Sequence, residues 1–412
     1  MSTTTIHLLG GSQTDFAVNW HREGKGFDVL VGAVVGATLA AANIASDEIG
    51  VIHVGNAFGQ LFTGQAQLGG MPATIIPELW GIPSGRHEAA CASGSMALLA
   101  AMADLESGRY DCALVIGAEL EKTVPGDEAA GYLGSAAWVG HEAQDTKFVW
   151  PTMFAELADE YDRRYGLDDT YLRAISELNI TNARTNPLAQ TRNWTFTPDS
   201  FGDDDTANPP MVGRLRRQDC SPMTDGAAAV ILVSDRFLAR RNDLRPEEHA
   251  VVSGWGHRTV GLSMAQKLRA SADDQYVFPH VRQTMLDALA RAGLPDIDAV
   301  DGIEVHDCFS MSEYMAIDHL GITGPGESWK AVAGGDIARD GRLPVNPGGG
   351  LIGGGHPVGA TGVRMVLDAY KQVTGQAGAY QVPDARRFAT LNLGGSATTA
   401  ASFIVASQTK RS

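Results

Sequence analysis

The sequence predicts an α/β fold built from two similar halves. Short apolar runs typical of buried strands alternate with Ala-rich or amphipathic runs typical of helices. Such alternation favours parallel strand pairing with helices packed on the sheet faces. The order of features in the first half recurs in the second half, which indicates a duplication. A length of 412 residues agrees with two or three structural units.

The first half alternates strands and helices with few interruptions. We expect strands at 6–11, 48–57, 110–119 and 225–234, and helices at 26–44 and 91–108. Gly108 stands where a helix commonly ends in a left-handed residue.

The second half begins near residue 247. We expect a helix at 281–294, a strand that runs into a turn at 298–309, a helix at 359–370 and a closing hairpin at 387–406. Each half thus offers a glycine turn, a Cys or His, a small-residue helix and an apolar strand.

The stretch 121–217 interrupts this pattern. It begins with an aromatic segment and continues with a part rich in Pro, Asn and acidic residues, where a sheet strand is hard to place. We therefore expect an inserted loop domain at 121–217. The first half would cover 1–120 and be completed by 218–246, and the second half would cover 247–412.

Composition excludes several classes of protein. Hydrophobic residues make up 44% and charged residues 19%, which is typical of a globular protein and not of a disordered one. The net charge of −16 argues against nucleic-acid and membrane-surface binding. Neither a signal peptide nor a run of 18 apolar residues is apparent. The four cysteines form no CxxC pair and favour a reducing compartment, so we expect a cytoplasmic protein.

Cys91 is the first candidate for chemistry. It directly precedes a strongly helical segment, where the helix dipole and free N–H groups favour a thiolate, and such cysteines can have pKa values of roughly 3.5–7.5. Small neighbours at 92–95 would let a substrate approach. A small buried hydrophobic residue is an equally good interpretation of the position alone.

Two histidines stand in unusual settings. His356 follows six glycines within 348–355, more than a purely structural loop usually needs, although a flexible linker is the alternative. His306 ends an apolar strand, where α/β folds often place functional groups. For His306 alone, a core histidine bonded to a carbonyl is the better interpretation.

Cys308 follows His306 by two residues, and Cys112 and Cys220 are expected in the core. Zinc binding is less favoured than nucleophilic catalysis because no metal-ligand spacing such as CxxC or HxxxH is present, and we expect no metal. Two thiols and two imidazoles suit carbon–carbon bond exchange at thioesters. One thiolate attacks a carbonyl, the other thiol moves a proton at carbon, and N–H groups stabilise oxyanions.

Four motifs resemble those of the thiolase superfamily and occur in the expected order: CASGSMALLAAM at 91–102, TDGAAA at 224–229, HDCF at 306–309 and GGGHPVGATG at 353–362. Most thiolases have an NEAF-type motif in place of HDCF and a CxG motif near the C-terminus. Here that position reads Asn392-Leu393-Gly394, without cysteine. Both departures resemble the sterol-carrier-protein type of thiolase, in which the HDCF cysteine supplies the second thiol.

The resemblance implies a fold and a set of roles. Each half would be a βαβαβαββ unit in a layered α/β/α/β/α arrangement. Cys91 would be the acylated nucleophile, His356 its base, and Cys308 the acid/base at the alpha carbon. His306 and His356 would stabilise the enolate oxygen, and the backbone N–H groups of Cys91 and Gly394 the tetrahedral intermediate.

The resemblance also implies an acyl-CoA C-acyltransferase, with acyl-CoA and CoA as substrates and no permanently bound cofactor. The inserted domain would shape the acyl pocket. Arg214, Arg216 and Arg217 are weak candidates for CoA binding, because a solvated charged turn is the commoner role of such a run. Thiolases are usually dimers or tetramers, so we expect a homodimer or homotetramer.

Three other functions remain open. A decarboxylating ketoacyl synthase also uses one Cys and two His, but it needs no second thiol. A thiolase-like lyase that acts as a retro-aldolase with a small partner protein would be expected to lack the nucleophile. A non-catalytic lipid-binding or scaffolding role would leave the co-occurrence of Cys91, His306, Cys308 and His356 without a reason.

Overall fold

A computed structural model describes residues 4–241, 243–245 and 249–408. Its main sheet has nine strands in the order β3-β2-β4-β7-β1-β8-β11-β10-β9 within these residues. The strands are β1 (Ile6–Gln13), β2 (Val51–Gly55), β3 (Ser84–His87), β4 (Cys112–Glu119), β7 (Gly226–Ser234), β8 (Ala250–Thr259), β9 (Gly302–Val305), β10 (Arg387–Gly394) and β11 (Thr399–Ser407).

The sheet consists of two halves joined by a short seam. Strands β3, β2, β4, β7 and β1 form the first half, and β8, β11, β10 and β9 form the second. Between β1 and β8 only two residue pairs are in register, His7 with Val251 and Leu8 with Ala250. Parallel pairing occurs between β2 and its neighbours β3 and β4, and between β9 and β10. The duplication predicted from the sequence is therefore visible in the strand order.

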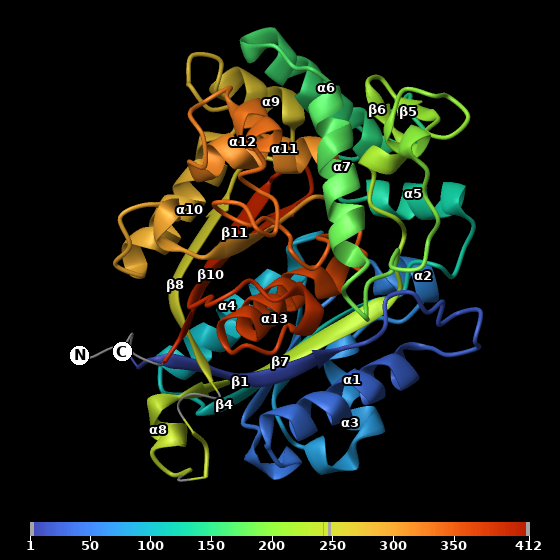
Figure 1. Cartoon of the computed structure of the whole chain (residues 1–412). Helices are drawn as coiled ribbons and strands as arrows, with labels where there is room; N and C mark the ends of the chain where they lie inside the picture. Colours follow the sequence, from blue (N-terminus) through green and yellow to red (C-terminus); the bar gives the residue numbers. More distant parts are fainter. Residues whose placement is uncertain (1–3, 242, 246–248, 409–412) are drawn as a thin grey trace.

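Two helices lie between the halves. Helices α4 (Ser93–Glu106) and α13 (Thr361–Val373) contact each other, and α13 contacts strands of both halves. Their apolar faces share one core cluster with residues of β1, β4, β7, β10 and β11. Figure 1 shows α4 and α13 side by side in the middle of the molecule. Helix α4 consists mainly of small and aliphatic residues, and nearly all side chains of α13 are buried, which suits a layer enclosed on both faces.

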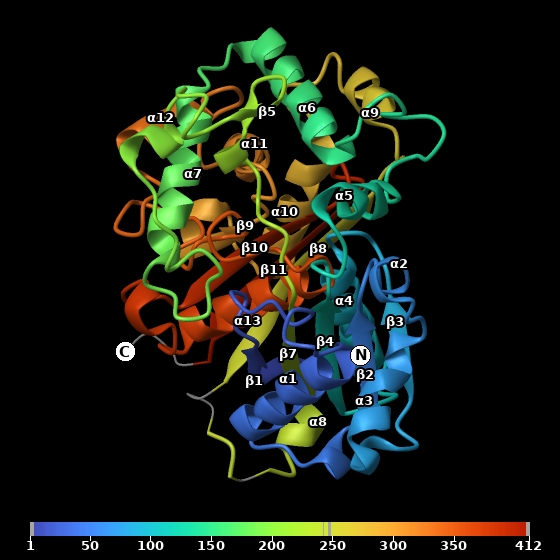
Figure 2. The same cartoon turned by 90° about the vertical axis from the view of Figure 1, so that its right-hand side faces the viewer.

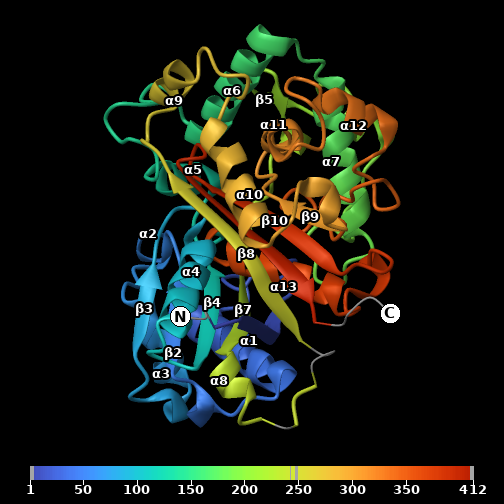
Figure 3. The same ribbon diagram turned by 90° about the vertical axis from the view of Figure 1, so that its left-hand side faces the viewer.

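Outer helices cover the remaining faces of the sheet. On the first half lie α1 (Phe27–Ala42), α3 (Met71–Ile75) and α8 (Asp235–Leu238), and on the second half lie α10 (Pro279–Arg291) and α11 (Ser310–Leu320). Figure 3 shows α10 lying across β8. This contact requires glycine, because a Cβ on Gly256 would lie 1.8 Å from the carbonyl oxygen of Thr284 in α10. The α/β/α/β/α layering expected from the sequence is confirmed.

The segment 121–217 is more helical than its composition suggests. It contains α5 (Gly126–Gly134), α6 (Val149–Tyr165), α7 (Thr170–Ala183) and the short hairpin β5 (Pro210–Val212) and β6 (Leu215–Arg216). Apolar residues of α6 and α7 join the core cluster of α11, so this segment rests on the second half (Figure 2). Shorter helices are α2 (Gly59–Thr63), α9 (Met264–Ala270) and α12 (Ser328–Gly334). In the part of the chain that the structure describes, no helix is long and apolar enough to cross a bilayer.

Candidate active site

Cys91 lies on a strained turn at the start of α4. The preceding residue, Ala90, has φ 49°, a left-handed conformation that is unfavourable for a residue with a Cβ. The turn is held by the Ser93 hydroxyl, which donates to the Ala90 carbonyl at 2.6 Å and accepts from the Ala89 N–H at 3.0 Å. Ser93 N–H also donates to the Ala90 carbonyl at 3.0 Å. The thiol of Cys91 is thereby fixed just before the first turn of the helix.

The Cys91 thiol is not a preformed thiolate, so the expected low pKa is wrong. Burial raises its pKa to about 12, and the negative charge of Glu121 acts in the same direction. Hydrogen bonds from the backbone N–H groups of Gly395 and Cys91 itself lower the pKa but do not compensate. The helix dipole acts within one turn, and here desolvation of the sulfur outweighs it. Cys91 therefore needs a base.

The glycine run before His356 is a fixed loop. It wraps around the buried carboxylate of Asp307, which accepts the N–H groups of Leu351 at 2.6 Å and Ile352 at 3.1 Å. Gly350 has φ +59°, and a Cβ there would lie 2.5 Å from an Asp307 oxygen. A side chain at Gly350 would therefore displace the carboxylate around which the loop folds.

Further contacts hold His356 itself in the cavity wall. Its N–H donates to the Thr224 hydroxyl at 2.8 Å, and two residues later the N–H of Val358 donates to Glu121 at 2.7 Å. Burial, together with the nearby charge of Arg364, lowers the pKa of His356 to about 3. His356 is thus a neutral imidazole that has a lone pair available for a proton.

The structure brings together the sulfur of Cys91 and both histidines. One ring nitrogen of His306, one of His356 and the Cys91 sulfur all lie within 4.8 Å of one another. The imidazole rings are 5.2 Å apart and nearly perpendicular, with an interplanar angle of 84°. This spacing could hold a metal ion, and it is also the spacing of a thiol with its base and a hydrogen-bond donor.

Cys308 lines the same cavity as Cys91. Its sulfur lies 3.8 Å from the Ser312 hydroxyl, in the first turn of α11. Burial raises the pKa of Cys308 well above its ordinary value, and proximity to Cys91 raises it further. Both thiols are therefore protonated at neutral pH and line the same cavity.

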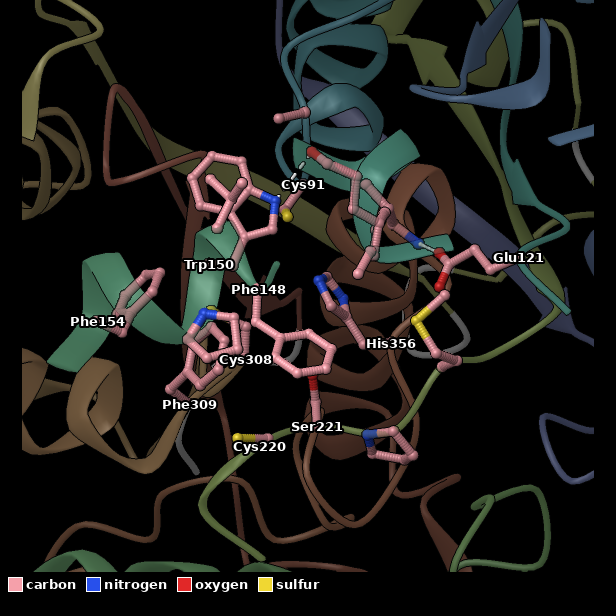
Figure 4. Close-up of a pocket in the computed structure, with 18 of the residues that line it drawn as sticks. Cys91, Glu121, Phe148, Trp150, Phe154, Cys220, Ser221, Cys308, Phe309 and His356 are labelled. Atoms are coloured by element: carbon pink, nitrogen blue, oxygen red, sulfur yellow. Dashed lines mark hydrogen bonds between the residues drawn. The ribbon is translucent and has the colours of Figure 1, made fainter. Parts of the chain in front are cut away.

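The cavity has a volume of about 230 Å³ and walls that are mainly apolar. Figure 4 shows His356, Phe148 and Trp150 around the Cys91 thiol. The apolar side chains of its wall come from α5, α6 and the loops around them as well as from the two halves: Phe58, Leu133, Phe148, Val149, Trp150, Phe154, Met211, Met223 and Phe309.

The two remaining cysteines differ in their settings. Cys112 is 1% exposed within β4, as expected for a core residue. Cys220 is not in the core, which corrects the prediction from the sequence, because it lines the cavity beside Ser221 and Pro222. The segment before β7 crosses the cavity wall, a path that local sequence does not reveal.

The backbone N–H that reaches the Cys91 sulfur belongs to Gly395 and not to Gly394. Gly394 is the last residue of β10 and pairs with Thr399 of β11. It packs directly under the turn of Cys91, where a Cβ would lie 2.2 Å from the Ala89 carbonyl oxygen. Gly395 follows with φ +60° and leaves the ladder, so its N–H is free to point at the sulfur.

The three candidate arginines separate into two groups. Arg214 lies near Asp162 and Asp169, and Arg216 near Asp203 and Asp205, so both are ion-paired. For Arg217, no carboxylate of the described residues is within salt-bridge distance, and its side chain lines a second cavity of about 280 Å³.

Several residues of the site escaped the sequence analysis. Glu121 lines the cavity, Thr361 contacts the ring of His356 at 2.7 Å, and Asn392 contacts the ring of His306 at 3.1 Å. Thr361 stands within the GATG motif and Asn392 at the divergent CxG position, so both lie in motifs already noted, although the motifs alone assign them no role. Glu121 carried no local signal, because its role depends on contacts with Val358 and Thr224, far along the chain.

Comparison with known proteins places this geometry in a family. The model of the thiolase N-terminal domain matches residues 10–165, and the model of the thiolase C-terminal domain-like family matches 263–407. An acetyl-CoA acetyltransferase of Methanothermobacter thermautotrophicus is 33% identical over 400 residues, covering 96% of this chain and 98% of that protein. Sterol carrier protein 2 of Gallus gallus is 30% identical over 370 residues, covering 86% of this chain and 63% of that protein.

A solved structure also has the same fold. The Ltp2-ChsH2(DUF35) aldolase superposes with a TM-score of 0.78 at 20% identity, covering 99% of both chains. At that identity the likeness concerns the fold alone. The two family models and the acetyltransferase relative go further, because together they span nearly the whole chain. The chain belongs to the thiolase family.

Proposed function

We propose that the protein is an acyl-CoA C-acyltransferase that cleaves 3-ketoacyl-CoA with CoA, or runs the reverse Claisen condensation, through an acyl group on Cys91. The observation that carries this proposal is the cluster of Cys91, His306 and His356 within 4.8 Å, at a cavity that also contains the thiol of Cys308. The acetyl-CoA acetyltransferase relative supports the reaction class.

Cleavage begins with His356 as general base. Its neutral ring takes the proton of Cys91, and the sulfur attacks the 3-keto carbon of the substrate. The N–H groups of Gly395 and Cys91, which already reach the sulfur, stabilise the oxyanion that forms. Burial raises the pKa of Cys91 and lowers that of His356, which favours proton transfer that accompanies attack over a preformed thiolate–imidazolium pair.

Collapse of the intermediate breaks the carbon–carbon bond. The departing alpha carbon takes a proton from Cys308, whose raised pKa keeps it in the acid form. Before CoA enters, the proton that His356 took from Cys91 passes to the Cys308 thiolate in the shared cavity, which returns both groups to their starting states. CoA then loses its thiol proton to His356 and attacks the acyl group, and Cys91 leaves and recovers that proton. Condensation is the same sequence in reverse.

The acyl group would occupy the apolar cavity. Aromatic side chains of the 121–217 segment, among them Phe148, Trp150 and Phe154, line it. We therefore propose that 121–217 is an inserted loop domain. The first half then covers 1–120 and is completed by 218–246, and the second half covers 247–412. Burial of an apolar chain against such a wall is favourable, about 0.8 kcal/mol per methylene.

CoA would lie across the segment 220–222, which separates the catalytic cavity from the second one. Arg217 lines that second cavity together with Trp194 and Phe196. A cation beside aromatic rings suits a phosphorylated nucleotide. We expect Arg217→Ala to raise the KM for CoA about tenfold with little change in kcat. Arg184→Ala, which removes an exposed arginine outside both cavities, should change neither.

Mass spectrometry tests the acyl intermediate. Brief incubation with acetyl-CoA or a longer acyl-CoA should label Cys91 and leave Cys112 and Cys220 unlabelled. Cys220 is an internal control, because it lines the same cavity but is not part of the cluster that Cys91 forms with His306 and His356. A label on Cys220 alone would overturn the assignment. Cleavage rates on a panel of 3-ketoacyl-CoAs would identify the preferred chain length.

The same assays separate the alternative functions. A retro-aldolase would cleave a 3-hydroxyacyl-CoA without an acyl-enzyme, and a ketoacyl synthase would keep its activity without Cys308. The presence of Cys308 in the cavity favours the thiolase reaction over the synthase.

We also propose a homodimer or homotetramer, supported by β3 at the outer end of the sheet, with one edge available for pairing. Light scattering tests the oligomeric state. Four free thiols support a reducing compartment such as the cytoplasm.

A further inference from the structure

The ring of His306 is set by its neighbour on the next strand. Parallel pairing of β9 with β10 brings Val305 opposite Leu391, and the N–H of His306 donates to the Leu391 carbonyl at 2.9 Å. His306 therefore lies beside Asn392, on the same face of the two strands. The side-chain amide nitrogen of Asn392 is 3.1 Å from Nδ1 of His306.

Ser95 fixes the orientation of that amide. The Ser95 hydroxyl donates to Oδ1 of Asn392 at 2.7 Å, which turns the NH2 group of Asn392 toward His306. All three residues are 1% exposed, so no solvent competes for these bonds. Ser95 stands in the first turn of α4, four residues after Cys91. The bonds thus connect the helix of the nucleophile, strand β10 and the histidine.

These contacts specify which nitrogen of His306 carries the proton. An amide NH2 group can only donate, so Nδ1 must be the unprotonated nitrogen. Burial and the nearby His356 lower the pKa of His306, so the ring is neutral and its single proton is on Nε2. Nε2 of His306 is buried and has no hydrogen-bond partner among the described residues. An unpaired buried donor is costly unless a ligand completes it.

His356 has the opposite arrangement. Its Nδ1 lies 2.7 Å from the hydroxyl oxygen of Thr361, and the proton of that hydroxyl goes to the Pro357 carbonyl at 2.9 Å. The Thr361 oxygen must then accept, so Nδ1 of His356 is protonated and its Nε2 has the lone pair. The two nearly perpendicular rings therefore offer one donor and one acceptor to the space beside Cys91.

We propose that Asn392 is a positioning residue that holds His306 as the Nε2–H tautomer, so that His306 donates to the enolate oxygen of the acetyl-CoA unit while His356 acts as base. This inference rests on the proposed function. It also assigns a role to the position at which most thiolases have the CxG cysteine. At this position the chain has Asn392, whose amide orients the imidazole of His306. The second thiol stands elsewhere, at Cys308.

The decisive measurement is nitrogen-15 NMR of protein labelled at histidine, because protonated and unprotonated ring nitrogens differ widely in chemical shift. Signals are assigned by their loss in His306→Gln and His356→Gln. Wild-type protein should show one Nε2–H ring at His306 and one Nδ1–H ring at His356. An Nδ1–H tautomer at His306 would overturn the proposal, and this result does not depend on any activity.

Asn392→Asp keeps the shape but replaces the donor with an acceptor. Nδ1 of His306 should become protonated, and exchange of the alpha protons of acetyl-CoA with heavy water should fall about 100-fold or more, the effect of removing one oxyanion donor. Acylation of Cys91 should change by less than about threefold, since another pair of donors serves that step. Asn392→Asp can also leave both nitrogens of the His306 ring protonated. This result supports the same role if alpha-proton exchange persists at low pH and is lost as Nε2 of His306 loses its proton.

Two controls separate this proposal from loss of fold and from failure of the proposed function. Asn208→Asp alters another buried asparagine, in the loop domain, and should leave the His306 signals and the exchange rate unchanged. If Nδ1 of His306 stays unprotonated in Asn392→Asp and the alpha protons of acetyl-CoA still exchange at the wild-type rate, the positioning role is refuted. If wild-type protein neither acylates Cys91 nor exchanges alpha protons, the proposed function fails, whereas the tautomer assignment is still decided by NMR.

Discussion

The segments that precede the two central helices, α4 and α13, are stabilised in different ways. The turn before α4 places an alanine, Ala90, in a left-handed conformation and holds it with the side chain of Ser93. The loop before α13 uses glycines to wrap around the buried carboxylate of Asp307. Both solutions bring one reactive side chain to the beginning of a helix that is enclosed between the halves of the sheet.

The duplicated halves differ more in chemistry than in architecture. In the proposed mechanism, the first half contributes only the nucleophile, Cys91. The second half contributes His356, the base that takes the Cys91 proton, and the two groups that act on the acetyl-CoA unit, His306 and Cys308. Since acyl transfer requires Cys91 and His356 whereas proton transfer at carbon requires Cys308, a single substitution at Cys308 should separate the two reactions.

Removal of the base should have the largest effect. His356→Ala eliminates the acceptor for the Cys91 proton and a contact of the oxyanion site, so cleavage of 3-ketoacyl-CoA should fall on the order of 10⁴-fold, with acylation itself slowed. Rapid-quench mass spectrometry measures acylation, and steady-state rates measure cleavage. His257→Ala, an exposed histidine on β8, is the control. Acylation at the wild-type rate in His356→Ala would place the base elsewhere.

Removal of the second thiol should divide the reaction. Cys308→Ala should still take an acyl group onto Cys91, but alpha-proton exchange of acetyl-CoA in heavy water should fall roughly 10²–10⁴-fold, with cleavage and condensation. The matched control is Cys112→Ala, which removes a buried thiol in β4, outside the cavity, and should keep both activities. Exchange at the wild-type rate in Cys308→Ala would show that another group acts on the alpha carbon.

The pH dependence of alkylation distinguishes a neutral Cys91 from a helix-activated thiolate. Only the thiolate reacts with iodoacetamide, and with a pKa of about 12 its fraction rises about tenfold per pH unit through the neutral range. Alkylation of Cys91 in the free protein, followed by digest mass spectrometry, should therefore increase steadily from pH 7 to about pH 10. Glutathione in the same tube should level off near its own, lower pKa. A plateau in the alkylation of Cys91 below about pH 8 would show that the thiol has the low pKa expected from its position at a helix N-terminus.

Sequence patterns were sufficient for the layers, and they singled out Cys91, His306 and His356, which the structure brings within 4.8 Å of one another. Apolar runs identified β4 and β7, and small-residue periodicity identified α4 and α13, because these elements are buried on both faces. The central strand β8 was not predicted. Its Gly254 and Gly256 are unfavourable in a strand by propensity, but they admit α10 at close range, a contact that is visible only in three dimensions.

The electrostatics of the site could not be predicted from local sequence. Helix position favours a thiolate at Cys91, whereas burial by distant segments and the charge of Glu121 decide its pKa. The hydrogen bond that reaches the sulfur comes from Gly395, one residue after the glycine implied by the motif, because β10 ends at Gly394. Both differences arise where segments about 30 and 300 residues away meet the same atom.

The strained turn before α4 should yield the smallest effect. A left-handed alanine costs about 1–2 kcal/mol, and glycine relieves that cost but adds about 0.5–1 kcal/mol of chain entropy to lose on folding. Ala90→Gly should therefore leave the free energy of unfolding unchanged or raise it by up to about 1 kcal/mol, as measured by urea denaturation. The comparison variant is Ala103→Gly, at an exposed position with ordinary helical geometry in the same helix, which should lower it by about 1 kcal/mol. If both substitutions destabilise equally, Ala90 carries no strain. If Ala90→Gly is stable but acylates Cys91 more slowly, the rigid alanine contributes to holding the sulfur in place for attack.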